Sequence, residues 1–294
     1  VMLNYMCRHI DKTLVEWKNN PFHKPLLLRG ARQVGKSSAV RHFSEQFEYF
    51  AEVNFERDKD FSTFFRGSLD VRLICSKLSN FLQVPIVAGK TLLFFDEIQS
   101  CPEAIMALRF FKEDYPELHV VAAGSLLEFA LQGLPTFGVG RIHSVFMYPM
   151  TFDEFVMANG MEGLLSARNL ADFSHPLDEA FHDKLVEQFR LYLLVGGMPE
   201  AVAMWKTTSD LLQCQRIHDD IMLTYEDDFS KYSRRVSPEL LRLALHGVCH
   251  QIGKKLTYSR ISESLRSYQI RDALDLLTLA GIITPVVPTA ANGF

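Results

Sequence analysis

The sequence predicts an α/β protein built on a central parallel sheet and followed by a smaller helical region. Three runs rich in apolar residues lead to this expectation, because an apolar run is typical of a strand buried in a parallel sheet. The runs begin at Pro25, Thr91 and Leu118, and stretches with helical periodicity separate them. Each run ends in glycine or polar residues, at the edge where α/β sheets bind ligands.

The first run leads into a string that fits G-x-x-x-x-G-K-[ST], the P-loop or Walker A pattern. Its glycines let the loop close around phosphate oxygens with backbone N–H groups. We expect Lys36 to reach the β- and γ-phosphates and the Ser37 hydroxyl to ligate Mg²⁺. A chance match in a glycine-rich turn is the alternative, which the strand before and the helical pattern after the string disfavour. The residues expected to bind the nucleotide here are Gly30, Ala31, Arg32, Gln33, Val34, Gly35, Lys36, Ser37 and Ser38.

The second run ends in the acidic pair Asp96-Glu97, a Walker B pattern with an added glutamate. We expect Asp96 to hold Mg²⁺ together with Ser37, and Glu97 to act as general base on the attacking water. Two exposed acids in a turn are the alternative. The P-loop about 60 residues upstream argues against it.

Two further residues are catalytic candidates beside Lys36 and Glu97. Ser125 ends the third run, where a hydroxyl can contact the γ-phosphate or the water, although it can equally cap the following helix. A glycine-rich loop over residues 133–140 delivers Arg141. This arginine could stabilise transition-state charge in cis or from a neighbouring subunit. A plain surface arginine is the alternative.

Periodicity and turn residues predict the other elements of the first two thirds of the chain. Thr151 and Glu154 form the sequence pattern of a capping box that starts a short helix. Ser209 is expected to cap a long helix. We expect strands over 49–56 and 144–148, helices over 3–19, 37–47, 61–80, 102–114, 126–131, 152–160, 181–194, 199–205 and 210–228, and a loop-rich connector over 161–176.

From residue 237 the predicted order is that of a winged helix. Helices are expected over 237–250, 259–266 and 270–280, with extended pieces over 256–258 and 282–287. A wing needs a returning strand, and none follows before Phe294, so we expect the chain to be a fragment. The resulting domain division is a P-loop core over 1–180, a helical lid over 181–235 and a winged-helix-like module over 236–294.

The charge distribution bears on partners. The net charge of −4 excludes a uniformly basic nucleic-acid coat, yet the stretch from Lys231 to Arg271 carries nine basic and two acidic residues. This local basic face indicates contact with duplex DNA. Asp272 and Asp275 on the predicted recognition helix oppose it, and an intramolecular or oligomer interface is the alternative. Five scattered cysteines without a C-x-x-C pair favour the cytoplasm, and no apolar run approaches membrane-spanning length.

These motifs together resemble a family of bacterial and archaeal AAA-superfamily ATPases with a C-terminal domain of unknown function. The resemblance spans about residues 5 to 285, and it implies a helical lid, a winged helix and a further nuclease-like part beyond this chain. It also implies that Asn54 restrains the catalytic glutamate and that Pro199, in a Gly-x-Pro motif of the lid, packs on adenine. The matching strings are LLLRGARQVGKS, VNFE, LLFFDEIQ, AAGSLLEFAL, GRIHSVFMYPMTFDEF, LVGGMPEAV and YEDDFSKY.

We therefore expect a Mg-ATP-binding ATPase. The lack of the usual lid arginine beside the Gly-x-Pro motif favours a slow switch over a fast motor. The lack of an Asn-Lys-x-Asp string favours adenine over guanine. The alternatives are a DNA-binding protein gated by nucleotide, whose ATP turnover is incidental, and a regulator of a nuclease-like C-terminal domain. Partners left open are duplex DNA and a second copy of the chain.

Overall fold

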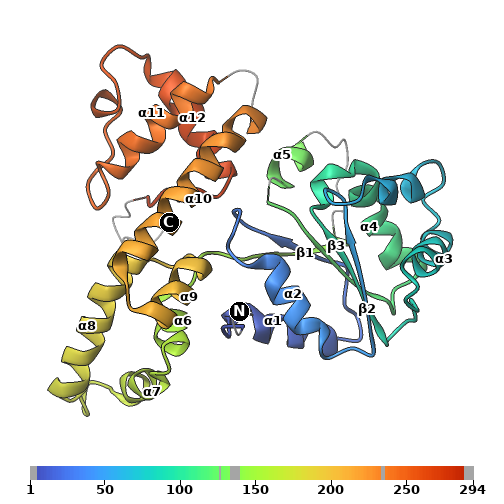
Figure 1. Cartoon of the computed structure of the whole chain (residues 1–294), viewed down its shortest axis with the longest axis horizontal. Coiled ribbons are helices and arrows are strands. Elements are labelled where there is room, and N and C mark those ends of the chain that lie inside the picture. Colours follow the sequence, from blue (N-terminus) through green and yellow to red (C-terminus); the bar gives the residue numbers. More distant parts are fainter. Residues whose placement is uncertain (1–4, 126, 133–139, 233–235, 288–294) are drawn as a thin grey trace. The chain divides into compact units, whose positions relative to one another are not determined.

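The structure, a computed structural model, describes residues 5–125, 127–132, 140–232 and 236–287 (Figure 1). The chain forms two compact units, Val1–Asp219 and Asp220–Phe294, so that the boundary falls within the long helix α10 (Leu211–Tyr232). Over the described part of the chain, no helix has the length and apolar content needed to cross a membrane.

The first unit contains a five-stranded sheet with the order β2-β3-β4-β1-β5, and every neighbouring pair is parallel. The predicted α/β class with a parallel sheet is confirmed. Because the carboxyl ends of parallel strands share one edge, the segments that follow β1, β3 and β4 meet there. The strands are β1 (Leu26–Arg29), β2 (Tyr49–Asn54), β3 (Thr91–Asp96), β4 (His119–Ala123) and β5 (His143–Phe146).

The runs are rich in apolar residues because both faces of the sheet are covered. Alternate residues of a strand point to opposite faces, so Leu26 and Leu28 join one core while Leu27 joins the other. Phe94 and Phe95 divide in the same way. The first core includes helices α1 (His9–Asn19) and α2 (Lys36–Ser44), and the second includes η1 (Lys59–Phe65), α3 (Val71–Leu82), η2 (Ile98–Ser100), α4 (Pro102–Asp114) and α5 (Leu127–Gln132) (Figure 1).

Two predicted helices of this unit have different bounds in the structure. The first begins at His9 rather than residue 3, because the Asp11 carboxylate accepts the Arg8 N–H at 2.7 Å and marks the helix start. The helix predicted over 61–80 is divided into η1 and α3, since Gly67 takes a left-handed backbone and Asp70 caps the second helix.

Four helices follow the sheet within the first unit. The capping box is confirmed: the Thr151 hydroxyl accepts the Glu154 N–H at 3.2 Å, and the Glu154 carboxylate accepts the Thr151 N–H at 2.8 Å. The prediction of a loop-rich connector over 161–176 was wrong, because a helix forms over Glu162–Leu170. This helix packs Leu165 against Val156 and Leu185. The four are α6 (Phe152–Ala158), α7 (Glu162–Leu170), α8 (Glu179–Val195) and α9 (Pro199–Thr208).

The cap of α10 was assigned to the wrong residue. Ser209 has a left-handed backbone and ends α9, whereas the Asp210 carboxylate accepts the Leu212 N–H at 2.9 Å. Asp210 therefore satisfies the free N–H groups at the start of α10, which a serine was expected to do.

The described residues of the second unit form helices joined by turns and irregular segments, without a strand. Helices α11 (Pro238–Cys249) and α12 (Ser267–Leu279) form its main elements, with a short turn η3 (Tyr258–Arg260) between them. The helix predicted over 259–266 is reduced to this single turn, and no strand forms over 256–258 or 282–287. An extended segment without a neighbouring strand has no ladder to stabilise it, and Val286 and Val287 are almost fully exposed. The winged helix predicted here is thus not formed by the described residues.

Candidate functional site

The loop between β1 and α2 depends on two glycines. Gly30 and Gly35 have φ angles of 141° and 96°, in the left-handed region that favours glycine. A Cβ atom on Gly30 would also lie 2.1 Å from the Met147 carbonyl oxygen. The close approach of these two backbones fixes where the loop begins, and α2 then starts at Lys36.

Lys36 is buried at the foot of this loop. Its Nζ donates to the carbonyl oxygens of Gly30 and Ala31, at 2.9 and 2.7 Å. Burial lowers the pKa of Lys36 to about 8, although the nearby Glu97 and Asp96 carboxylates oppose the shift. The ammonium group is therefore held on carbonyls of its own loop, where phosphate oxygens can compete for it.

Ser37 and Asp96 form the pair expected to hold a metal ion. The Ser37 hydroxyl donates to Asp96 Oδ1 at 2.9 Å, and the Asn54 amide donates to Asp96 Oδ2 at 3.2 Å. Burial raises the pKa of the Asp96 carboxyl, and the Ser37 hydrogen bond opposes that shift. A buried carboxylate beside a hydroxyl is a suitable oxygen donor set for Mg²⁺.

Glu97 follows β3 with an unusual backbone. Its φ of 51° is left-handed, which is uncommon outside glycine. One of its carboxylate oxygens accepts the side-chain amide of Gln99 at 2.7 Å. The resemblance implied that Asn54 restrains Glu97. In the structure the Asn54 amide bonds to Asp96 instead, because the strand register places Asn54 opposite Asp96. The sequence analysis missed Gln99, although the string DEIQ contains it.

An open cavity of about 840 Å³ extends along the P-loop within the first unit. Ser125 lies on its wall, buried, and its Oγ has no hydrogen-bond partner among the described residues, so no N-cap bond forms there. Pro199 lies beside the loop, since a Cβ on Gly35 would be 3.5 Å from its Cγ. Predicted site residues that line the cavity are Arg32, Gln33, Gly35, Lys36, Ser37, Ser38, Glu97, Ser125 and Pro199, whereas Gly30, Ala31, Val34, Asp96 and Asn54 are not among its lining residues.

Arg141 is not brought to this cavity. It precedes β5 and forms an ion pair with Glu113 near the end of α4. Because parallel strands start together, the start of β5 lies at the edge of the sheet opposite the P-loop. The expected role of Arg141 in cis therefore does not fit the structure. The loop before it lies mostly outside the described residues.

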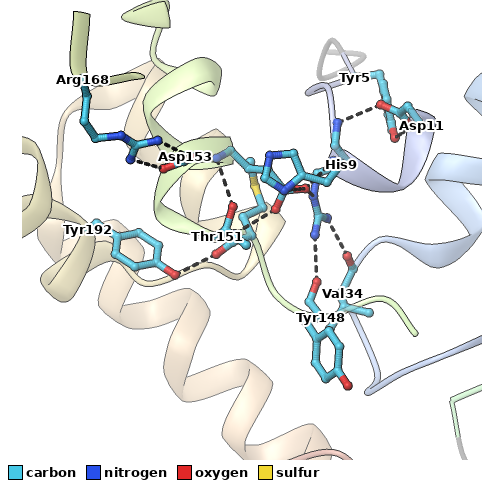
Figure 2. A network of polar contacts seen from close by, with 12 residues as sticks. Tyr5, His9, Asp11, Val34, Tyr148, Thr151, Asp153, Arg168 and Tyr192 are labelled. Carbon is cyan, nitrogen blue, oxygen red and sulfur yellow. Dashed lines mark hydrogen bonds and ion pairs between the residues drawn. The ribbon is translucent and has the colours of Figure 1, made fainter. Parts of the chain in front are cut away.

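Arg8 joins the cavity from a segment that the sequence analysis assigned to an ordinary helix. Its guanidinium donates to the carbonyl oxygens of Val34 and Tyr148, at 3.0 and 2.8 Å. Its Nε lies 3.1 Å from Glu154 Oε1, at an angle unsuited to a hydrogen bond. Figure 2 shows this network, which ties the P-loop to the start of α6. Nothing in the sequence around Arg8 signals these distant partners.

The fold and this set of side chains define a P-loop nucleotide-binding protein. Residues 22–156 match the family model of an AAA domain, and residues 186–294 match that of a domain of unknown function (DUF8612). Residues 22–156 thus form an AAA domain of the P-loop ATPase superfamily, and a domain of unknown function follows it, as the sequence resemblance predicted. No curated protein matches its sequence.

Solved structures agree with the fold. The chain is similar to the Walker-type ATPase of Pyrococcus abyssi, with a TM-score of 0.58 and 16% identity over 95% of this chain and 91% of that one. Weaker similarities include the Aeropyrum pernix ORC1 protein in complex with DNA (TM-score 0.37, 14% identity, 94% and 82% of the two chains) and a signal transduction ATPase with a tetratricopeptide repeat sensor from Pyrococcus horikoshii (TM-score 0.39, 13% identity, 96% and 40%).

Proposed function

We propose that the chain is a Mg-ATP-dependent ATPase that works as a slow nucleotide-driven switch in the cytoplasm. The observation that carries this proposal is one cavity lined by Lys36, Ser37, Glu97 and Ser125. These four residues lie in the segments that follow three neighbouring strands, β1, β3 and β4. Together they supply phosphate binding, metal binding and a base, the parts that phosphoryl transfer to water requires.

Each side chain has a distinct role in the proposed reaction. Lys36 exchanges its loop carbonyls for the β- and γ-phosphate oxygens, while Ser37 and Asp96 hold Mg²⁺, which neutralises charge on those phosphates. Glu97 accepts the proton of the attacking water. Ser125, whose hydroxyl has no partner among the described residues, contacts the γ-phosphate or the water. A P-loop without a general base would bind nucleotide and turn it over much more slowly.

Part of the cavity wall fits the base of the nucleotide. Pro199 and Ala203 from α9 line it, together with Tyr5 and Met6 from the segment before α1. Tyr5 stacks on His42, with ring centroids 4.1 Å apart, and its hydroxyl donates to Asp11 at 2.6 Å. Flat apolar surfaces of this kind suit an adenine ring. We assign the base contact to Pro199, and α9 then moves with nucleotide state.

Lys36→Ala is expected to weaken ATP binding at least tenfold and to reduce phosphate release to background, because the variant loses a buried charge that meets phosphate. Titration of the chain with MgATP and a phosphate-release assay measure the two effects. Since Lys36 has a pKa of about 8, ATP affinity of the parent should also fall as the pH rises above 8, and the variant should lack this dependence. Lys77→Ala, at an exposed position on α3, is the control. Equal turnover in parent and variant would exclude the proposed site.

A second candidate function is the binding of duplex DNA by the second unit. Five exposed basic residues there have no ion-pair partner among the described contacts, whereas Lys231 and Arg242 are paired with Asp228 and Glu226. Unpaired, exposed cations are the groups that contact DNA phosphates. The five are Lys254, Lys255, Arg260, Arg266 and Arg271. In this case bound nucleotide would gate DNA binding, and ATP turnover would be incidental. A second copy of the chain could place Arg141 at the site in trans.

The double variant Lys254→Glu/Lys255→Glu tests this second function. If the face binds duplex DNA, affinity should drop at least tenfold and the logarithmic salt dependence should become shallower by about one unit for each lost phosphate contact. Fluorescence anisotropy with a labelled duplex at several salt concentrations measures both. The charge-matched control is Lys59→Glu/Lys77→Glu on the first unit, where both lysines are exposed. If DNA affinity changed neither with salt concentration nor in either double variant, duplex DNA binding by this face would be excluded and the face would be assigned to a protein interface.

A further inference from the structure

Glu97 lies on the wall of the cavity, yet one of its carboxylate oxygens is already engaged. Gln99 Nε2 donates to Glu97 Oε2 at 2.7 Å. The orientation of this amide follows from chemistry, because a carboxylate only accepts hydrogen bonds and the amide nitrogen must therefore face it. The general base of the proposed reaction is thus held by a side chain two residues away.

The local backbone creates this contact. Glu97 has a left-handed conformation, and the N–H of Ser100 donates to its carbonyl oxygen at 3.1 Å, which closes the turn η2. A left-handed residue followed by a tight turn brings the side chain of Gln99 back toward Glu97. Because a left-handed backbone is costly for a residue with a Cβ atom, the surrounding contacts have to stabilise it.

The other end of the Gln99 amide is under-satisfied. Its Oε1 is buried and has no hydrogen-bond partner among the described residues. It occupies space that exists only because residue 124 is glycine, since a Cβ there would lie 2.1 Å from Oε1. Gly124 immediately precedes Ser125. The amide of Gln99 therefore lies between Glu97, which follows β3, and the backbone at Gly124, which follows β4 and leads to Ser125.

We propose that Gln99 is a positioning residue that restrains Glu97 while the site holds no γ-phosphate. The restraint rests on the proposed ATPase function. The hydrogen bond from Gln99 occupies a carboxylate oxygen of Glu97 that would otherwise accept the proton of the attacking water. Because Oε1 of Gln99 is buried without a hydrogen-bond partner among the described residues, this position of the amide is only weakly stabilised, and Gln99 can leave Glu97. A nucleotide that contacts Ser125 shifts the backbone next to Gly124, and this displaces the amide from Glu97. Asn54 cannot serve this role in the present arrangement, because its amide is bonded to Asp96.

Gln99→Met tests the restraint, because methionine keeps the length of the side chain and removes both hydrogen-bonding groups. We expect kcat for ATP hydrolysis to rise about three- to tenfold, with KM and the affinity for a non-hydrolysable ATP analogue unchanged within twofold. Gly124→Ala should also raise kcat, because the added methyl group would clash with Oε1 of Gln99 and displace the amide from Glu97. Gln46→Met, at an exposed position after α2, is the matched control.

Combination with Glu97→Gln separates the restraint from a structural role. If Gln99 acts through Glu97, Gln99→Met should have no effect on turnover when Glu97 is already replaced. A lower kcat or a weaker analogue affinity in Gln99→Met would overturn the restraint and indicate support of the fold. If the parent hydrolyses ATP and no Gln99 or Gly124 variant raises its rate, the proposed restraint is wrong and the ATPase function stands. Absence of turnover in the parent and in every variant would refute both.

Discussion

Glu97→Gln is expected to lower ATP turnover about 10²- to 10⁴-fold, the usual contribution of a general base. Glutamine keeps the size of the side chain and the acceptor oxygen that faces Gln99, but it cannot take a proton from water. ATP binding should change no more than threefold, because the P-loop and the Ser37–Asp96 pair remain. A separation of binding from turnover distinguishes the loss of a base from the loss of a site.

Steady-state phosphate release and a single-turnover measurement with excess enzyme test the Glu97 prediction together. The matched control is Glu117→Gln, an exposed glutamate that precedes β4 at the opposite edge of the sheet. Its turnover should equal that of the parent. If Glu97→Gln retained more than a tenth of the parent rate, another group would have to accept the proton, and Glu97 would not be the general base.

Strands β1, β3 and β4 of the first unit could be predicted because they are buried on both faces. The runs after Pro25, Thr91 and His119 are apolar throughout, and a continuous apolar run of this kind has few other interpretations in a chain with a P-loop. The order β2-β3-β4-β1-β5 could not be predicted from these runs. Strand order depends on the contacts between strands, and neither periodicity nor spacing records them.

The parts of the site that lie within a motif could be predicted, and the parts built by distant segments could not. Lys36, Ser37 and Asp96 meet because parallel strands end at one edge. Arg8 reaches Tyr148 across 140 sequence positions, which no local pattern encodes. Asn54 was placed at the correct strand end, but one position of register decides whether its amide meets Asp96 or Glu97.

The second unit was the least predictable. The helices around Leu241 and Leu274 have clear apolar faces and were expected. The residues between them, from Gln251 to Arg266, are mostly exposed. The helix expected over 259–266 therefore depended on intrinsic helix propensity alone, because these residues pack against no core that would stabilise it. Extended segments need a partner strand, and a sequence pattern cannot supply one. The region keeps a basic surface although it forms no winged helix, because Lys254 and Lys255 are exposed.

Arg8→Ala is expected to destabilise the first unit by about 3–5 kcal/mol, the usual cost of removing one partner of a buried ion pair. Arg8 and Glu154 are both buried, and the Glu154 carboxylate would keep its charge without the guanidinium beside it. The variant also leaves the carbonyl oxygens of Val34 and Tyr148 without their donors. Unfolding in urea measures the loss. Both tryptophans, Trp17 and Trp205, belong to the first unit, so their fluorescence reports on that unit.

The pH dependence distinguishes a lost ion pair from lost packing. Burial alone would raise the pKa of Glu154, but hydrogen bonds from the Thr151 and His9 N–H groups and the Arg8 charge outweigh burial and lower it. A lowered pKa stabilises the fold above the ordinary value of 4.5 and ceases to do so as the pH falls through the folded-state value. Without Arg8, Glu154 takes up its proton at higher pH, and a neutral carboxyl costs less to bury. The gap in stability between parent and variant should therefore narrow as the pH is lowered.

Arg168→Ala provides the comparison that makes the Arg8 prediction decisive. Arg168 pairs with Asp153 through two contacts of 2.7 Å, one residue away from Glu154, but about a third of each side chain is exposed (Figure 2). Solvent screens such a pair, so its loss should cost no more than about 1 kcal/mol. If both variants lost the same small amount, burial would not amplify the Arg8–Glu154 interaction. A large loss for Arg8 that stays constant with pH would assign the effect to the two carbonyl contacts instead of the ion pair.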